Sequence, residues 1–155
     1  MIRKILLLTM LILSFTGYTP AQNSGFGAGL KFGQPTGITA KYWLGGNNAL
    51  SGSLGYSLLA DGKFYLSVDY LYHSFGLVKS TEEFPVFYGF GARFIAQEND
   101  GGSFGIRGVG GISWHSKQYP LELFVEFAPV FRLLPTAGLD LDAALGGRYY
   151  FSISQ

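Results

Sequence analysis

The chain contains two histidines, His73 and His115, and each is followed directly by a serine. A histidine that takes a proton from a serine hydroxyl turns that hydroxyl into a nucleophile, and a glutamate can hold the histidine in place. These residue types therefore raise the hypothesis of a hydrolase. The alternative is that both histidines are polar side chains at strand ends, near a boundary with solvent.

Two pairs of acidic residues suggest a second kind of chemistry. Glu122 and Glu126 form one pair, and Asp140 and Asp142 form the other. Paired carboxylates can serve as acid and base or can hold a cation. The members of each pair fall on the same face of a strand, where arginines from other strands are the expected neighbours. We therefore favour ion pairs over an ion-binding site.

The segment Gly25-Phe26-Gly27-Ala28-Gly29 matches part of a phosphate-binding loop, but such a loop precedes a helix and none is expected here. We interpret these glycines as room for long side chains that arrive from other strands. The same Gly-Phe-Gly-Ala sequence recurs at 89–92, which hints at an internal duplication. The chain has no cysteine, so thiolate metal sites and disulfides are excluded. No catalytic residue, metal site or cofactor is predicted.

The N-terminal residues predict export from the cytoplasm. Arg3 and Lys4 precede an almost continuous apolar run at 5–15, and small residues follow at 19–21. This pattern is typical of a secretory signal peptide over residues 1–21, which leaves one domain over residues 22–155. The apolar run is shorter than the roughly 20 residues of a membrane-spanning helix. Removal of Arg3 and Lys4 changes the formal net charge from +1 to −1, so no basic surface indicates nucleic acid as a partner.

The remaining chain predicts an all-β domain. Aromatic residues make up 17% of the chain and charged residues only 14%, and apolar residues alternate with polar ones rather than follow a helical period. Turn signals rich in glycine, asparagine, aspartate and proline separate eight such stretches. The predicted strands are Gly25 to Phe32, Thr36 to Leu44, Ala49 to Leu58, Phe64 to His73, Pro85 to Ala96, Ser103 to Trp114, Leu121 to Arg132 and Leu139 to Ile153.

The alternation places apolar and charged residues on opposite faces of every predicted strand. In the last strand, one face runs from Leu139 to Phe151 without a charge, whereas the other carries Asp140, Asp142 and Arg148. We predict that all strand charges form one structural network. Its members are Lys31, Lys41, Asp69, Arg93, Arg107, Glu122, Glu126, Arg132, Asp140, Asp142 and Arg148.

Two architectures fit this separation of faces. A soluble sandwich or barrel, with a ligand pocket in the latter case, would bury the apolar face and expose the charges. In an outer-membrane barrel the apolar face contacts lipid and the charges fill the lumen. We favour the membrane barrel, because the apolar face gathers aromatic residues toward the strand ends, and because the polar face combines many glycines and serines with nearly balanced charges. Eight strands enclose a lumen wide enough only for side chains, so we expect no open pore.

Several segments in order also resemble a family of small, uncharacterised outer-membrane β-barrel proteins with an OmpA/OmpX-like eight-stranded barrel. These segments are QPTGITAKYWL at 34–44, DYLYHSF at 69–75, YGFGAR at 88–93, PLELFVEFAP at 120–129 and GGRYYF at 146–151. The resemblance covers nearly the whole chain after the signal peptide. It implies an eight-stranded antiparallel up-and-down transmembrane barrel, and it supplies no catalytic residues. Outer-membrane barrels commonly end on an aromatic residue that the insertion machinery reads, whereas here residues 152–155 follow Phe151.

The sequence therefore predicts a monomeric, non-enzymatic barrel of the cell outer membrane, with a structural or interaction role. The predicted partners are outer-membrane lipid and the barrel-insertion machinery. With the N-terminus in the periplasm, the connections that face outward are short and the longest connection, at 74–84, is periplasmic. The alternatives are a lipid-modifying hydrolase and a narrow ion channel. The hydrolase is less favoured, because both histidines end strands at the periplasmic side, away from the outer leaflet.

Overall fold

The computed structural model describes residues 25–57, 63–96 and 101–151, and the predicted signal peptide lies outside these residues. Eight strands are present, and their ends agree with the predicted ones to within about two residues wherever both are described. Among the described residues, no helix is long and apolar enough to cross a membrane. The strands are β1 (Phe26–Gly33), β2 (Thr36–Gly45), β3 (Asn48–Ser57), β4 (Lys63–Ser74), β5 (Val86–Ile95), β6 (Ser103–His115), β7 (Leu121–Leu134) and β8 (Gly138–Phe151).

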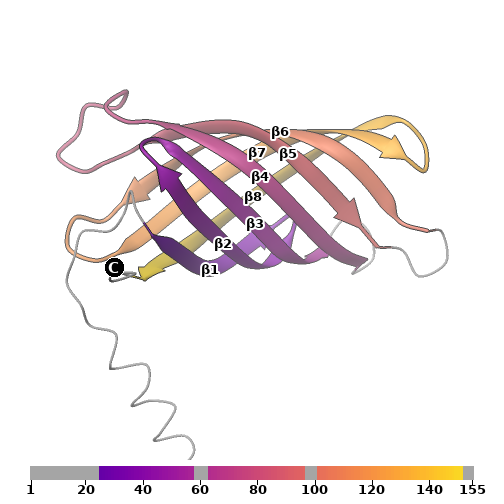
Figure 1. Ribbon diagram of the computed structural model, residues 1–155, viewed down its shortest axis with the longest axis horizontal. Helices are drawn as coiled ribbons and strands as arrows, with labels where there is room; N and C mark the ends of the chain where they lie inside the picture. The colour runs from indigo at the N-terminus through magenta and orange to yellow at the C-terminus, as the bar shows by residue number, and fades with distance from the viewer. Residues whose placement is uncertain (1–24, 58–62, 97–100, 152–155) are drawn as a thin grey trace, which may run out of the picture.

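The strands close into a barrel in simple chain order. Each strand pairs antiparallel with the next, and β1 pairs with β8 from Phe26↔Phe151 to Gly33↔Ala144. The ribbon forms a long cylinder whose strands run obliquely to its axis (Figure 1). This closure confirms the predicted all-β, eight-stranded, up-and-down antiparallel fold.

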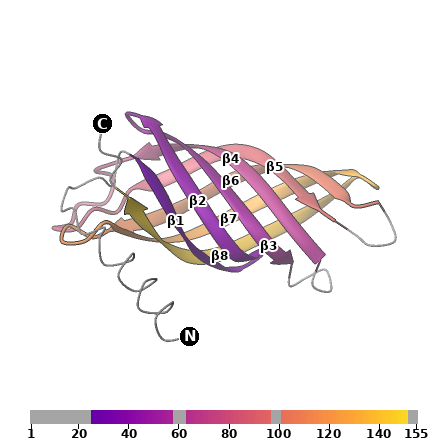
Figure 2. The ribbon, with the colours of Figure 1, turned by 60° about the horizontal axis from the view of Figure 1, so that its bottom comes forward.

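The two ends of the barrel differ in the connections that they carry. We call the end where β1 begins and β8 ends the terminal end, and the opposite one the distal end; Figure 2 shows the start of β1 and the end of β8 on the same side. The terminal end carries the long β4–β5 connection and the tight β2–β3 turn. That turn requires glycine, because Gly45 and Gly46 have φ values of 118° and 58°.

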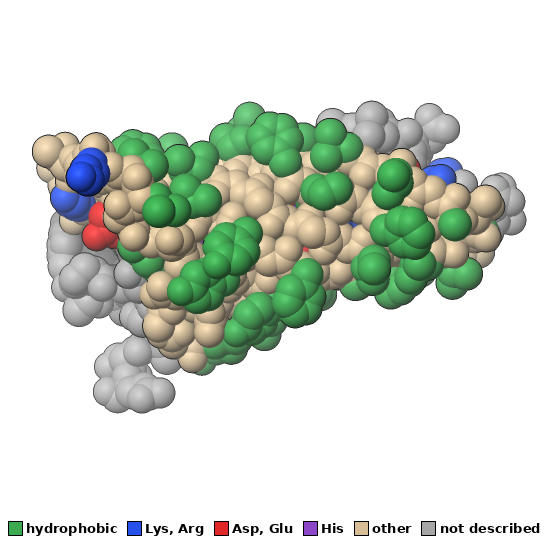
Figure 3. Space-filling model, turned by 90° about the horizontal axis from the view of Figure 1, so that it is seen from above, with side chains coloured by type: hydrophobic (Ala, Val, Ile, Leu, Met, Phe, Trp, Pro, Cys, Tyr) green, Lys and Arg blue, Asp and Glu red, His purple; other side chains and the backbone are tan. Residues whose placement is uncertain are grey.

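Apolar side chains cover the outside of the barrel, and most of the charged ones lie inside. Phe90, in the middle of β5, is 70% exposed, whereas Arg107 on the neighbouring β6 is 2% exposed. Figure 3 shows hydrophobic side chains along the wall, with the larger charged patches near the two ends. Of the eleven predicted lumen residues, only Arg132 and Asp140, near the distal end, keep substantial side-chain exposure, 35% and 29%.

Two glycines of β1 serve different purposes. A Cβ on Gly27 would lie 2.7 Å from the ring of Tyr150, so this glycine does make room for a side chain from another strand, as predicted. A Cβ on Gly29 would lie 1.8 Å from the backbone oxygen of Gly147. Gly29 therefore permits close approach of the β8 backbone, and the predicted explanation is wrong for this position.

The contrast between two glycines gives a test of the barrel geometry. We expect Gly29→Ala to lower the free energy of unfolding by about 1–3 kcal/mol, because the added carbon collides with backbone that cannot move independently. Gly110→Ala is the matched control, since a Cβ at Gly110 has nothing within 4 Å. Urea unfolding in detergent micelles, followed by tryptophan fluorescence, measures both. Equal stability of the two variants would contradict the β1–β8 pairing described here.

Candidate functional site

The lumen is the candidate site, because it gathers nearly all of the chemically active side chains of the strands. The alternation of β1, β2 and β4–β8 turns every predicted network residue toward the axis or the distal mouth. These side chains form three layers along the axis, each centred on one residue. The centres are Glu122 near the terminal end, Arg107 in the middle and Arg93 near the distal end.

The middle layer is built around Arg107. Its Nε lies 3.0 Å from Asp69 Oδ1, its Nη2 lies 3.1 Å from Glu126 Oε1, and its Nη1 lies 3.3 Å from Asp142 Oδ2. Nη1 also donates to the hydroxyl of Tyr65 at 2.6 Å, and that hydroxyl donates to Asp142. One guanidinium thus connects β6 to β4, β7 and β8 across the lumen.

The layer nearest the terminal end is built around the fully buried Glu122. Its Oε1 accepts from Lys41 Nζ at 2.8 Å. Its Oε2 accepts from the hydroxyl of Tyr150 at 2.6 Å and lies 3.3 Å from Arg148 Nη1. Arg148 also donates to Thr39 Oγ1 at 2.9 Å, and its guanidinium carbon lies 3.9 Å from the ring centroid of Phe124. These donors compensate the negative charge of Glu122 for the loss of the water that would otherwise solvate it.

The distal layer is the most open of the three. Arg93 Nη1 lies 2.9 Å from Asp142 Oδ1, and Nη2 lies 2.5 Å from Asp140 Oδ2. Arg132 lies 3.5 Å from the other oxygen of Asp140 and donates to the backbone oxygen of Thr136 at 3.0 Å. Lys31, the remaining predicted member, pairs with Glu126 and donates to Ser53. All eleven predicted residues therefore take part in ion pairs.

The predicted polar face also carries large aromatic residues, which the sequence argument missed. Trp43 and Phe87 are buried in the lumen near the terminal end, where the Trp43 ring lies 4.4 Å from that of His73. The His73 ring lies 5.7 Å from that of Phe87, and Phe75 packs against both histidines. We call these five residues the terminal plug: Trp43, His73, Phe75, Phe87 and His115. Strict alternation places Trp43 and Phe87 on the charged face, so the sequence pattern could have predicted that both rings point into the lumen.

The histidines do not form the relay that the hydrolase hypothesis requires. Both are fully buried rather than at a boundary with solvent, which corrects the alternative prediction as well. His115 Nε2 lies 3.3 Å from Ser113 Oγ and 3.6 Å from Glu122 Oε1. A triad needs the serine on one ring nitrogen and the carboxylate on the other. Here one nitrogen faces both groups, and the neighbouring Ser116 accepts backbone N–H groups of its own turn.

The carboxylates likewise show no metal site. In the described part of the chain, no group of three or more histidine, cysteine, aspartate or glutamate residues could hold a metal ion. Of the two predicted acid pairs, the glutamates are divided, with Glu122 in the terminal layer and Glu126 in the middle one. Asp140 and Asp142 stay together on Arg93 in the distal layer, and Asp142 also contacts Arg107.

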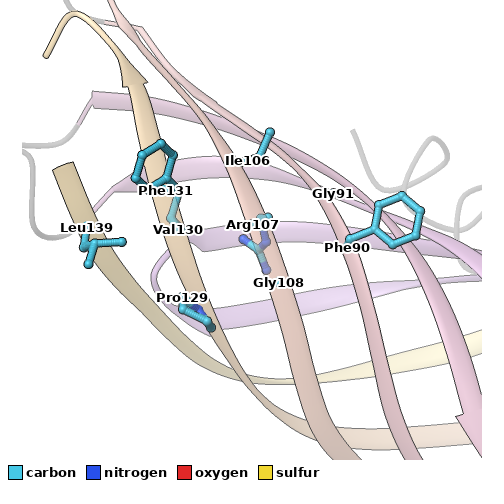
Figure 4. Close-up of a pocket in the computed structure, with 9 residues that line it drawn as sticks. All are labelled: Phe90, Gly91, Ile106, Arg107, Gly108, Pro129, Val130, Phe131 and Leu139. Carbon is cyan, nitrogen blue, oxygen red and sulfur yellow. The ribbon is translucent and has the colours of Figure 1, made fainter. Parts of the chain in front are cut away.

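The described residues line cavities that include two at the barrel wall. One is a polar space of about 320 Å³ at the distal mouth, which we call the distal vestibule. The other is an apolar groove of about 450 Å³ on the outside, where Leu139 and Phe131 stand on one side and Phe90 on the other (Figure 4). The groove lies where the β6–β7 ladder lacks pairs between Arg107↔Val130 and Gly110↔Phe127, beside Pro129, which has no N–H to donate.

Comparison with known proteins supports the fold. No protein-family profile and no curated protein matches the chain. Among solved structures, the chain is similar to the crystal structure of the N-terminal β-barrel domain of Pseudomonas aeruginosa OprF, with a TM-score of 0.57 and 17% sequence identity. The match covers 81% of this chain and 95% of that one. At this level of identity the likeness establishes a shared barrel fold.

Because the middle and distal layers differ in burial, substitutions of Arg107 and Arg132 should differ in their effect on stability. We expect Arg107→Met to lower the free energy of unfolding by about 3–5 kcal/mol, because it leaves buried carboxylates without their counter-charge. Arg132→Met removes a partly exposed guanidinium and should cost less than about 1 kcal/mol. Urea titration of both variants in micelles, with the native protein beside them, measures the difference. Similar losses for the two arginines would argue against a buried network in the middle layer.

Proposed function

We propose that this protein is a monomeric outer-membrane β-barrel with a structural or interaction role and without an open pore. The proposal includes removal of a signal peptide at 1–21 and insertion by the barrel-insertion machinery. Outer-membrane lipid is then the main contact of the wall. The shared fold with the OprF barrel domain is consistent with this assignment.

The observation that carries the proposal is the inverted distribution of side chains. Soluble monomers rarely expose continuous apolar patches larger than a few hundred Å². Here the outward side chains of every strand are mostly apolar, and nine of the strand charges are buried. In water, both the exposed apolar wall and the buried charges would be unfavourable. In a bilayer, acyl chains cover the apolar wall and the ion pairs are shielded inside.

Backbone geometry supports the same environment. A hydrocarbon core offers no hydrogen-bond partners, so a sheet can cross it only as a closed barrel. The strands are 8 to 14 residues long, which covers the roughly 9–11 residues needed to cross at a tilt of about 45°. Exposed aromatic pairs near the terminal end, such as Tyr72 with Tyr88 and Phe26 with Phe151, suit a position at the lipid headgroups.

The lumen supports a role other than conduction. The side chains of all three layers are largely engaged with one another, and the terminal plug lies beyond them. An ion that crossed would have to separate buried pairs, and removal of one partner from such a pair costs several kcal/mol. A closed barrel therefore fits the filled lumen better than a narrow channel does.

A charge placed on the wall distinguishes a bilayer from water. We expect Phe90→Arg to lower the free energy of unfolding in lipid vesicles by about 2–4 kcal/mol, because Phe90 lies at mid-strand on the outer face. Leu134→Arg is the control, since Leu134 is exposed at the distal end of β7, where the cost should be about 0–1 kcal/mol. A soluble barrel would tolerate both substitutions equally.

Cell fractionation tests the proposed location in the outer membrane. We expect the native chain to fractionate with outer membranes and, after detergent extraction, to migrate differently on gels before and after heating. Recovery from the periplasm without detergent would refute the membrane assignment and favour a soluble barrel.

The hydrolase alternative predicts a change in lipids that the geometry does not support. We expect His115→Gln and Ser113→Ala to leave the composition of outer-membrane lipids unchanged, as measured by mass spectrometry against a deletion strain. His73→Gln is the matched control, because His73 contacts Asn47 rather than a serine. A lipid product lost in the first two variants and kept in the third would establish hydrolysis instead.

A further inference from the structure

The distal vestibule differs from the rest of the lumen because it is open. Its volume is about 320 Å³, and its walls come from six strands and the β1–β2 connection. The polar residues that matter for its chemistry are Ser57, Lys63, Arg93, Ser103, Arg132 and Asp140.

Among the described residues that line the vestibule, cations outnumber carboxylates. Lys63, Arg93 and Arg132 line it, against Asp140 and Asp142. Asp142 is also neutralised from the middle layer, where Arg107 and the Tyr65 hydroxyl contact its Oδ2. Lys63 makes no ion pair with any residue that the structure describes. Within the described lining, the cations therefore outnumber the carboxylates, one of which, Asp142, is shared with the middle layer.

Two buried donors in the vestibule also lack partners. Arg93 is 3% exposed, and although both of its terminal nitrogens are paired, its Nε has no hydrogen-bond partner within the described residues. Ser103 Oγ is buried and likewise unpaired in that part of the chain. Buried polar atoms nearly always have a partner, because an unpaired one costs about 1–3 kcal/mol. Arg93 and Ser103 both line the vestibule, so their unpaired donors are the candidates to receive a ligand oxygen there.

The vestibule has a closed floor. Beneath it, Arg93 is joined to Asp142, and Asp142 is joined to Arg107 and Tyr65 of the middle layer. A solute that enters from the distal end therefore stops at this layer, so the space suits binding rather than passage.

We propose that the distal vestibule binds a small water-soluble solute through its phosphate group. Lys63 and Arg132, at the mouth, provide charge, and Arg93 and Ser103 provide buried donors below them. A tetrahedral phosphate presents several acceptor oxygens, which matches donors that converge from separate strands. The enclosed position inside the mouth selects a free phosphate compound over a lipid headgroup in the surrounding leaflet.

Nuclear magnetic resonance of the mature chain in phosphate-free maltoside micelles tests this proposal. We expect inorganic phosphate to cause saturable shifts of the backbone amides of Ser57, Ser103 and Leu141, and none at His115. Lys63→Met and Arg132→Gln should each weaken phosphate binding about five-fold, as for a partly exposed charge contact. Both residues lie at the rim, and unchanged spectra at the terminal end will show that the variants are folded.

Three controls make the outcome decisive. Lys117→Met removes the same charge at the terminal end and should leave the phosphate affinity unchanged. Chloride at equal ionic strength should not reproduce the shifts, and neither should phosphatidylglycerol added to the micelles. The proposal is overturned if phosphate causes no saturable shift, if the rim variants bind as well as the native protein, or if chloride or the lipid acts equally. These measurements do not depend on where the barrel resides in the cell.

Discussion

Closure of the sheet confines all inward-facing charges to one narrow cylinder, and the rest of the structure follows from that confinement. Water cannot solvate these groups along most of the lumen, so each cation must find its carboxylate among the other inward residues. Arg107 satisfies this requirement with three carboxylates from three strands, and Glu122 with three donors from β2 and β8. The polar interior thus takes the place that an apolar core has in a soluble barrel.

The same confinement fixes how the strands align. A shift of one residue in any strand would exchange its inward and outward sets, because side chains alternate with a period of two. For β6 the shift would turn Arg107 toward the surroundings and bring Ile106 and Ile112 into the lumen. The contacts of Arg107 span the barrel, so an error in β6 would also leave carboxylates on β4, β7 and β8 unpaired. Local strand pairing and long-range ion pairing therefore specify one register together.

Much of this architecture could be predicted from the sequence, because alternation is a local property. It correctly indicated the eight strands, their order and the inward direction of charges such as Lys41 and Arg148. Alternation does not give the height of a residue along the axis, which depends on the stagger between strands around the whole barrel. For this reason the contacts of His115 could not be predicted from the sequence: its neighbour in sequence is Ser116, but its ring lies against Ser113 and Glu122.

Height along the axis also explains why the two ends of the lumen differ chemically. At the terminal end, inward positions carry Trp43 and Phe87, whose rings close the space between the strands. At the distal end, the corresponding inward positions of β3, β6 and β8 carry Ser57, Ser103 and Asp140, which are too small to close it. A barrel that only spanned a membrane would have no need for this asymmetry, since either end could be filled in the same way. Among the described residues, an aromatic terminal end and a polar distal end with more cations than carboxylates instead leave a space that is closed at one end, which suits binding of a solute rather than conduction.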